Sequence, residues 1–169
     1  MILVLVLRLI HIFAGVFWAG SSFFLVSFVT PTVKLTGSEG AKFMQTLARG
    51  NRLTRALAIT GGLNVLSGLL LYWSASGGFN IGWITSASGL SITVGAVVGV
   101  LALIVGAGVG RTNNQIMSLG QEMQAAGGPP SEAQQTEMQA LQALAESRAI
   151  ITSVLLAITL IGMSIAQAL

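Results

Sequence analysis

Four long apolar segments dominate this sequence. They cover residues 2–30, 56–74, 84–110 and 149–168, and none of them contains an acidic residue. A helix needs about 20 consecutive apolar residues to cross the hydrocarbon core of a bilayer. Because the bilayer interior has no water to satisfy free backbone groups, such segments cross it as helices or as strands of closed barrels. We therefore predict an all-α membrane protein, with a bundle of four transmembrane helices in one domain spanning residues 1–169.

The composition argues against a soluble globular domain. Hydrophobic residues make up 53% of the chain and charged residues 8%, with a mean hydropathy of +0.83. Soluble domains carry roughly a quarter charged residues. So few charges cannot cover a core of this size, and the expected partner is the lipid bilayer. The net charge of +3 does not indicate nucleic acid, because the basic residues flank the apolar segments, where they set orientation.

The basic residues predict which connections face the cytoplasm. The 31–55 connection contains one acidic residue and five basic ones, which are Lys34, Lys42, Arg49, Arg52 and Arg55. The connection at 75–83 has no charge. Cytoplasmic loops carry an excess of Lys and Arg, so we expect loops 31–55 and 111–148 in the cytoplasm of a cell (inner) membrane protein, with both termini outside. Tyr72, Trp73 and Trp83 would then mark the outer interface.

The cytoplasmic connections contain helical signals. Pro31 is expected to end the first span, which we do not expect to be a cleavable signal because no charged region precedes it. Ser38 can cap an interfacial helix at about 38–49, with Phe43, Met44 and Leu47 on one face.

The second cytoplasmic connection predicts a helical hairpin at about 111–148. The third span continues in helical pattern past Arg111 until two glycines and two prolines at 127–130 force a turn. Ser131 and Gln134 have the spacing of a capping box, which opens a helix running into the fourth span. The expected extension projects from the membrane into the cytoplasm.

His11, the single histidine, is the main functional candidate. Arg8, His11, Gly15 and Trp18 fall roughly on one helix face, because residues three and four apart are neighbours there. An imidazole can ligate haem iron or another metal, and Arg8 could pair with a haem propionate. A bland alternative is that Arg8 extends to the interface and His11 donates to a carbonyl of a neighbouring helix. Trp18 would line a pocket or pack in the core.

Two residues in other spans could complete a cofactor site. Asn64 can bridge helices through its amide or line a cofactor pocket. Met163 could be a second axial ligand, although methionine more often fills gaps in a core. The His11 of a second copy is the alternative second ligand, and glycine-rich faces such as Gly95 and Gly99 favour a homo-oligomer.

Several common chemistries are excluded by the residues present. The chain has no cysteine and no aspartate, and it contains no Walker loop, zinc HExxH pattern, dinucleotide fingerprint or nucleophile elbow. With one histidine, no conventional catalytic triad can be built. These absences remove hydrolase and nucleotidase functions. A proton-driven transporter is disfavoured because no carboxylate lies within the spans.

The first span resembles the opening helix of a known membrane family. It reads His11-x6-Trp18-x-Gly20-x2-Phe23 and is followed by Val26 and Pro31. This pattern is similar to the copper resistance D (CopD-like) family and the related HemJ-type proteins, with looser similarity at 43–49, 61–68 and 89–111. The resemblance implies copper handling or haem and porphyrin chemistry, with the family's histidine at His11. A lysine found in the family's third helix is absent from 91–99.

These observations lead to one leading hypothesis and two alternatives. The leading hypothesis is a b-type haem protein, with His11 as axial ligand, that serves electron transfer or haem-linked redox chemistry. The first alternative is a scaffold or accessory subunit that docks a cytoplasmic or membrane protein partner through its hairpin. The second is a permease for copper, another metal ion or a small solute. Whether the protein is an enzyme is left open at this point.

Overall fold

The computed structural model describes residues 2–48, 52–166 and 168, and these residues form helices and short turns without a β-strand. Four helical segments are long and apolar enough to cross a membrane, judged by length and composition. They are Ile2–Leu35, Arg52–Ala75, Ala87–Ala125 and Glu132–Ile165. The predicted all-α class is thus confirmed, and each predicted span coincides over most of its length with one of the four long segments. The fourth segment ends at Ile165, three residues before the predicted end at 168.

The first segment continues past Pro31, so the prediction that this proline ends the span is wrong. Helix α1 (Ile2–Phe24) passes into a π-helical turn, η1 (Leu25–Val29), and then into α2 (Thr30–Leu35). The Thr30 N–H donates to the Leu25 carbonyl, five residues back. Proline lacks an N–H and crowds the preceding turn, and the wider π turn accommodates it within a continuous helix. Gly37, at a φ of 58°, then turns the chain.

A helix is present at the predicted position, α3 (Ser38–Ala48). Ser38 is its first helical residue, so the capping position falls one residue earlier than predicted. Arg49, where the predicted helix ends, lies outside the described residues. The next helix, α4 (Arg52–Ala75), begins four residues before the predicted span and ends one residue after it.

Side-chain caps set the starts of the three later helices. The short helix α5 (Ile81–Ile84) is capped by Asn80, and Ser86 caps α6 (Ala87–Ala125) by accepting from the Gly89 N–H. The third long helix therefore begins three residues after the predicted start. Helix α7 (Glu132–Ile165) opens with the predicted capping box of Ser131 and Gln134.

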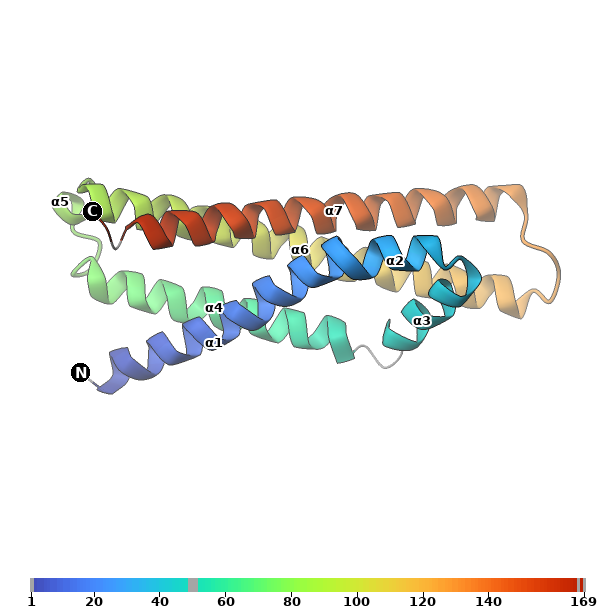
Figure 1. Cartoon of the computed structure of the whole chain (residues 1–169), viewed down its shortest axis with the longest axis horizontal. Coiled ribbons are helices and arrows are strands. Elements are labelled where there is room, and N and C mark those ends of the chain that lie inside the picture. Colours follow the sequence, from blue (N-terminus) through green and yellow to red (C-terminus); the bar gives the residue numbers. More distant parts are fainter. Residues whose placement is uncertain (1, 49–51, 167, 169) are drawn as a thin grey trace.

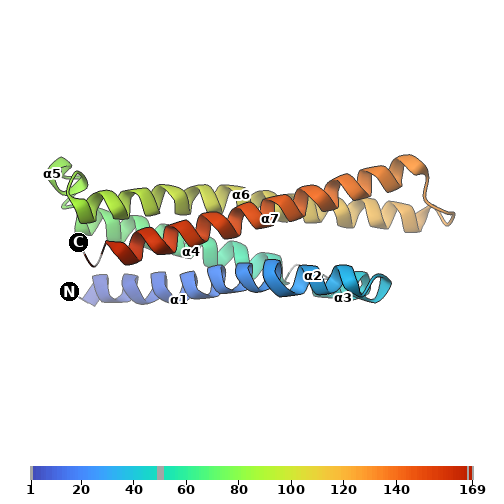
Figure 2. The same cartoon turned by 45° about the horizontal axis from the view of Figure 1, so that its top comes forward.

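The helices form two pairs that pack against each other (Figures 1 and 2). Helices α6 and α7 are a long antiparallel hairpin, and α1 crosses α4 beside it. The start of α1 and the end of α7 lie at one end of the molecule, and the 126–130 turn lies at the other. The two pairs meet at a small core of buried residues from α1, α6 and α7, which are Trp18, Ala19, Ala102 and Leu156.

Small residues allow α6 and α7 to approach closely. A Cβ built on Gly95 would lie 3.2 Å from the Met163 Cγ, and one on Gly99 would lie 3.4 Å from the Thr159 Cγ2. The predicted small-residue pair therefore packs against α7 within one chain, which is how such pairs bring helix backbones together. Met163 fills the space beside Gly95, as expected for a gap-filling methionine.

Candidate functional site

The imidazole of His11 lies between α1 and α4. Its Nδ1 is 2.8 Å from the backbone carbonyl oxygen of Asn64. Because a carbonyl oxygen can only accept a hydrogen bond, Nδ1 carries the proton and donates it. In the neutral ring this leaves Nε2 with a free lone pair. The same arrangement, a ring N–H held by a carbonyl, orients histidines that bind metals in proteins.

The side chain of Asn64 forms a second hydrogen bond to His11. The Asn64 Nδ2 donates to the His11 backbone carbonyl at 2.7 Å, so the two residues form a reciprocal pair between α1 and α4. Ser67 lies on the same side, and its hydroxyl is 3.4 Å from the His11 Nδ1 while it donates to the Leu63 carbonyl at 2.6 Å. Asn64 therefore bridges helices, the packing role weighed for it from the sequence.

Two glycines make room for this pair. A Cβ added to Gly68 would lie 2.8 Å from the His11 Cε1, and one added to Gly15 would lie 2.7 Å from the Asn64 Nδ2. Real Cβ atoms essentially never approach so closely, so each glycine is needed where the partner's side chain crosses. Each helix thus contributes one polar residue and one glycine to this contact. As a result, the imidazole lies against the α4 backbone.

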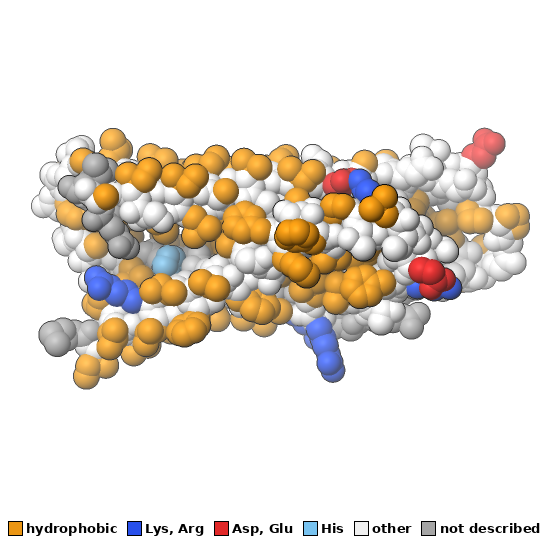
Figure 3. Space-filling model, viewed as in Figure 1, with side chains coloured by type: hydrophobic (Ala, Val, Ile, Leu, Met, Phe, Trp, Pro, Cys, Tyr) orange, Lys and Arg blue, Asp and Glu red, His pale blue; other side chains and the backbone are white. Residues whose placement is uncertain are grey.

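The second ring nitrogen of His11 reaches the molecular surface. Among the described residues, His11 Nε2 has no hydrogen-bond partner, and no buried side-chain nitrogen or oxygen there lacks one. Nε2 is therefore not fully buried. Figure 3 shows the single histidine, in pale blue, visible from outside between two ridges of side chains.

The other residues predicted for the site have different surroundings. Trp18 is only 5% exposed and contributes to the core, and its ring lies against Gly61 of α4. Together with His11 and Gly15 it faces α4, which confirms the predicted stripe for these three residues. Arg8, one turn before His11, is exposed. Met163 packs on α6 at Gly95, whereas His11 packs on α4.

A multi-ligand metal site is not found in the described part of the chain. No group of three or more His, Cys, Asp or Glu residues there lies close enough to hold a metal ion. Copper, zinc and similar ions in all-protein sites are usually held by several such ligands. Haem iron differs, because the porphyrin supplies four ligands and the protein adds only one or two.

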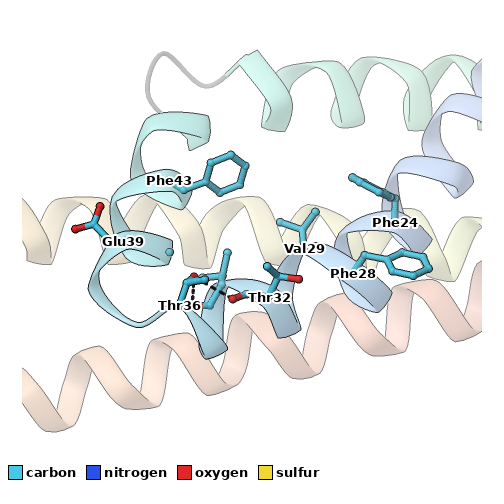
Figure 4. Close-up of a pocket in the computed structure, with 9 residues that line it drawn as sticks. Phe24, Phe28, Val29, Thr32, Thr36, Glu39 and Phe43 are labelled. Atoms are coloured by element: carbon cyan, nitrogen blue, oxygen red, sulfur yellow. Dashed lines mark hydrogen bonds between the residues drawn. The ribbon is translucent and has the colours of Figure 1, made fainter.

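Sequence reasoning missed a groove between η1, α2 and α3. It has a volume of about 440 Å³ and is lined mainly by apolar side chains, among them Phe24, Phe28 and Phe43. Figure 4 shows Phe43 pointing from α3 into the groove and Glu39 pointing away from it. The Glu39 carboxylate accepts from Lys42 at 2.8 Å. The groove depends on the turn at Gly37, which folds α3 back beside α2.

The hairpin tip packs largely against itself. Leu119 is buried, and Met117, Met123, Met138 and Leu141, which would favour partner docking if exposed, are each partly buried. A second hollow of about 450 Å³ lies at the tip and includes Met123 and Met138 in its lining. The apolar residues of the hairpin are thus shared between internal packing and this hollow.

Comparisons with protein-family models, with curated proteins and with solved structures find no match to this chain. The function therefore has to be inferred from the chemistry of its own residues. Of the candidate residues, His11 has the most defined geometry.

Proposed function

We propose that this chain is a four-span membrane protein that binds b-type haem through His11. The membrane assignment is supported by the four long apolar segments and by the apolar side chains on their outer faces. Phe13, Val16 and Ile161, for example, are 73%, 68% and 59% exposed. Lipid would cover these side chains in a bilayer.

The orientation we propose puts both termini outside. Six of the described basic residues lie on α2, on α3, in the first turn of α4 or in the middle of the α6–α7 pair, which are Lys34, Lys42, Arg52, Arg55, Arg111 and Arg148. Near the opposite end, Tyr72 packs against Phe79 and Trp83 with ring centroids 5.8 and 5.4 Å apart. Basic residues favour the cytoplasmic side and aromatic residues favour an interface, so the hairpin would project into the cytoplasm.

The haem proposal depends on one observation, the hydrogen bond from His11 Nδ1 to the Asn64 carbonyl. This bond fixes the ring and leaves Nε2 as an iron ligand. Haem also suits a chain with a single histidine and no clustered carboxylates or thiolates among its described residues. When bound, haem would supply one-electron chemistry, and His11 would hold and orient it.

Two residues near His11 would assist binding. The exposed guanidinium of Arg8, one helical turn closer to the proposed outer surface, could pair with a haem propionate. A second axial ligand would come from the His11 of a second copy, since Met163 is already packed against Gly95. The proposed functional unit is therefore a homo-oligomer.

An absorption spectrum tests the proposal. Protein expressed with ample haem and purified in mild detergent should show a Soret band that shifts on reduction with dithionite. His11→Ala should lose the band because no other histidine can replace the ligand. Phe13→Ala is the matched control, since Phe13 lies two residues away on the exposed face, and it should keep the band. A wild-type spectrum without a Soret band, or a band that persists in His11→Ala, would overturn the proposal.

A further inference from the structure

The hydrogen bonds and ion pairs that join the first segment to α7 lie in the second half of that segment. In the described residues, the Ser153 hydroxyl donates to the Ser22 carbonyl at 3.5 Å, and Lys34 pairs with Glu146 at 2.6 Å. The first-segment residues of both contacts come after Trp18 in the sequence, and Trp18 packs in the core with Leu156. His11 lies on the other side of this core, toward the start of α1.

The last half of α7 packs on α6 in this region. The Ser91 hydroxyl donates to the Gly162 carbonyl at 2.7 Å, and Thr159 and Met163 lie against Gly99 and Gly95. Figure 1 shows the first half of α1 diverging from the end of α7, with α4 between and behind them. The result is an opening along the side of the bundle, and Figure 3 shows the histidine within it.

The two half-helices that flank this opening are mainly apolar. On α7, Leu160, Ile161 and Ile165 are exposed, and on α1 Leu7 is partly buried one turn before His11. The only charged residue on either half-helix is Arg8. His11 lies nine residues after Ile2, which is about 14 Å along the helix axis. A hydrocarbon core of about 30 Å that begins near Ile2 would therefore contain His11.

We propose that the ligand of His11 reaches it sideways from the bilayer, through the opening between the first half of α1 and the last half of α7. This inference rests on the proposed haem site and adds the route and the class of ligand. A molecule that uses the route has an apolar body that partitions into lipid, a group that binds Nε2, and an anionic edge that can remain near Arg8. Haem has these properties, whereas a hydrated metal ion does not.

Accessibility measurements on single-cysteine variants test the route. The chain has no cysteine, so a spin label attached to Leu7→Cys or His11→Cys reports one position in the full-length protein in liposomes. Oxygen concentrates in lipid, and a nickel chelate remains in water. Phe13→Cys is the control for a lipid-exposed position, and Gln124→Cys, on the exposed surface of the hairpin, is the control for water.

The labels at Leu7 and His11 should collide with oxygen about as often as the Phe13 label does. They should collide with the nickel chelate much less often than the Gln124 label does. Adding haem should lower the oxygen collisions at Leu7 and leave those at Phe13 unchanged. Frequent nickel collisions would indicate an aqueous cavity and overturn the proposal, as would low collision rates with both reagents. In protein that shows the His11-dependent Soret band, the absence of a haem effect at Leu7 would also overturn it. If His11→Cys does not fold, Leu7→Cys gives the answer.

The two proposals fail separately. The accessibility measurement without haem reports the opening even if the Soret band is absent. Conversely, a Soret band that depends on His11 together with water access at Leu7 would support haem binding and reject the route through lipid.

Discussion

His11 and Asn64 hold each other through two hydrogen bonds of opposite direction, from Nδ1 to a carbonyl at 2.8 Å and from Nδ2 to a carbonyl at 2.7 Å. Larger side chains at the facing positions would displace these two side chains, because Gly15 lies opposite Asn64 and Gly68 lies opposite His11. Interhelical hydrogen bonds of this kind contribute about 0.6 kcal/mol on average in membrane proteins. Their larger effect here is to orient the imidazole.

Gly68→Ala should destabilise the protein. The added Cβ would lie 2.8 Å from the His11 Cε1, and overpacking of this kind typically costs about 1 to 3 kcal/mol, against a gain of about 1 kcal/mol in helix propensity. Unfolding in mixed micelles of increasing sodium dodecyl sulfate content measures the difference.

Gly62→Ala is the control for this substitution. It lies on the same helix, and a Cβ there meets no heavy atom within 4 Å. We expect this variant to unfold at the same detergent fraction as the wild type or a higher one. Equal stability of the two variants would show that His11 does not occupy the space beside Gly68.

Helices α6 and α7 are joined by different means along their length. Glycines and threonines bring the backbones together in the first part of α6, from Gly95 to Gly106. Farther along, the Arg148 Nη1 donates to the Thr112 hydroxyl at 2.6 Å and to the Gly108 carbonyl at 3.2 Å. The guanidinium is partly buried, and Thr112 is completely buried. This contact connects the span to the hairpin extension.

Thr112→Val should weaken the junction between α6 and α7. Valine keeps the shape of threonine but removes the oxygen that accepts from Arg148. Because the guanidinium is only partly buried and keeps its bond to the Gly108 carbonyl, we expect a loss of about 0.5 to 1.5 kcal/mol, the usual net contribution of one hydrogen bond. Detergent unfolding of the variant measures the loss. Thr136→Val, at an exposed position of α7, should change stability by less than about 0.5 kcal/mol. Similar losses in both variants would argue against a specific role for the Arg148 contact.

The molecule as a whole has two ends of different chemistry. One end carries the start of α1 at Ile2 and the end of α7 at Ile165. The packed aromatic rings of Tyr72 and Phe79 lie nearby. The other end carries the hairpin turn, and in that half of the molecule Lys34 of α2 donates to both carboxylate oxygens of Glu146 of α7. The two hairpin helices have 39 and 34 residues. At about 1.5 Å per residue, each helix is longer than a bilayer core is thick. A part of the hairpin would therefore extend into water.

Cysteine labelling in intact cells tests the proposed orientation. Ile81→Cys, in the exposed segment between α4 and α6, should react with a maleimide that cannot cross membranes. Gln124→Cys should react only after the cells are permeabilised, because we expect the hairpin in the cytoplasm. The reverse pattern would invert the orientation, and reaction of both sites in intact cells would contradict the four-span topology.

The amino-acid sequence was sufficient for the features that depend on local pattern. Length and hydropathy predict the four long helices, and the capping box at Ser131 and the glycines after Ala125 predict the hairpin, because these signals act over a few neighbouring residues. The lone histidine also indicated the candidate site, and its helical spacing to Gly15 and Trp18 indicated the face that packs on α4.

The packed structure supplied what local pattern could not. The Nδ1 of His11 binds a carbonyl 53 positions away in the sequence, and the opposing Gly68 is indistinguishable in the sequence from Gly62, which faces no neighbour within 4 Å. Pro31 reads as a helix end, yet the π turn before it allows the helix to continue. The groove beside Phe43 and the opening beside His11 likewise depend on how the helices cross. Crossing geometry arises from contacts between distant segments, which is why the three-dimensional arrangement was needed to find them.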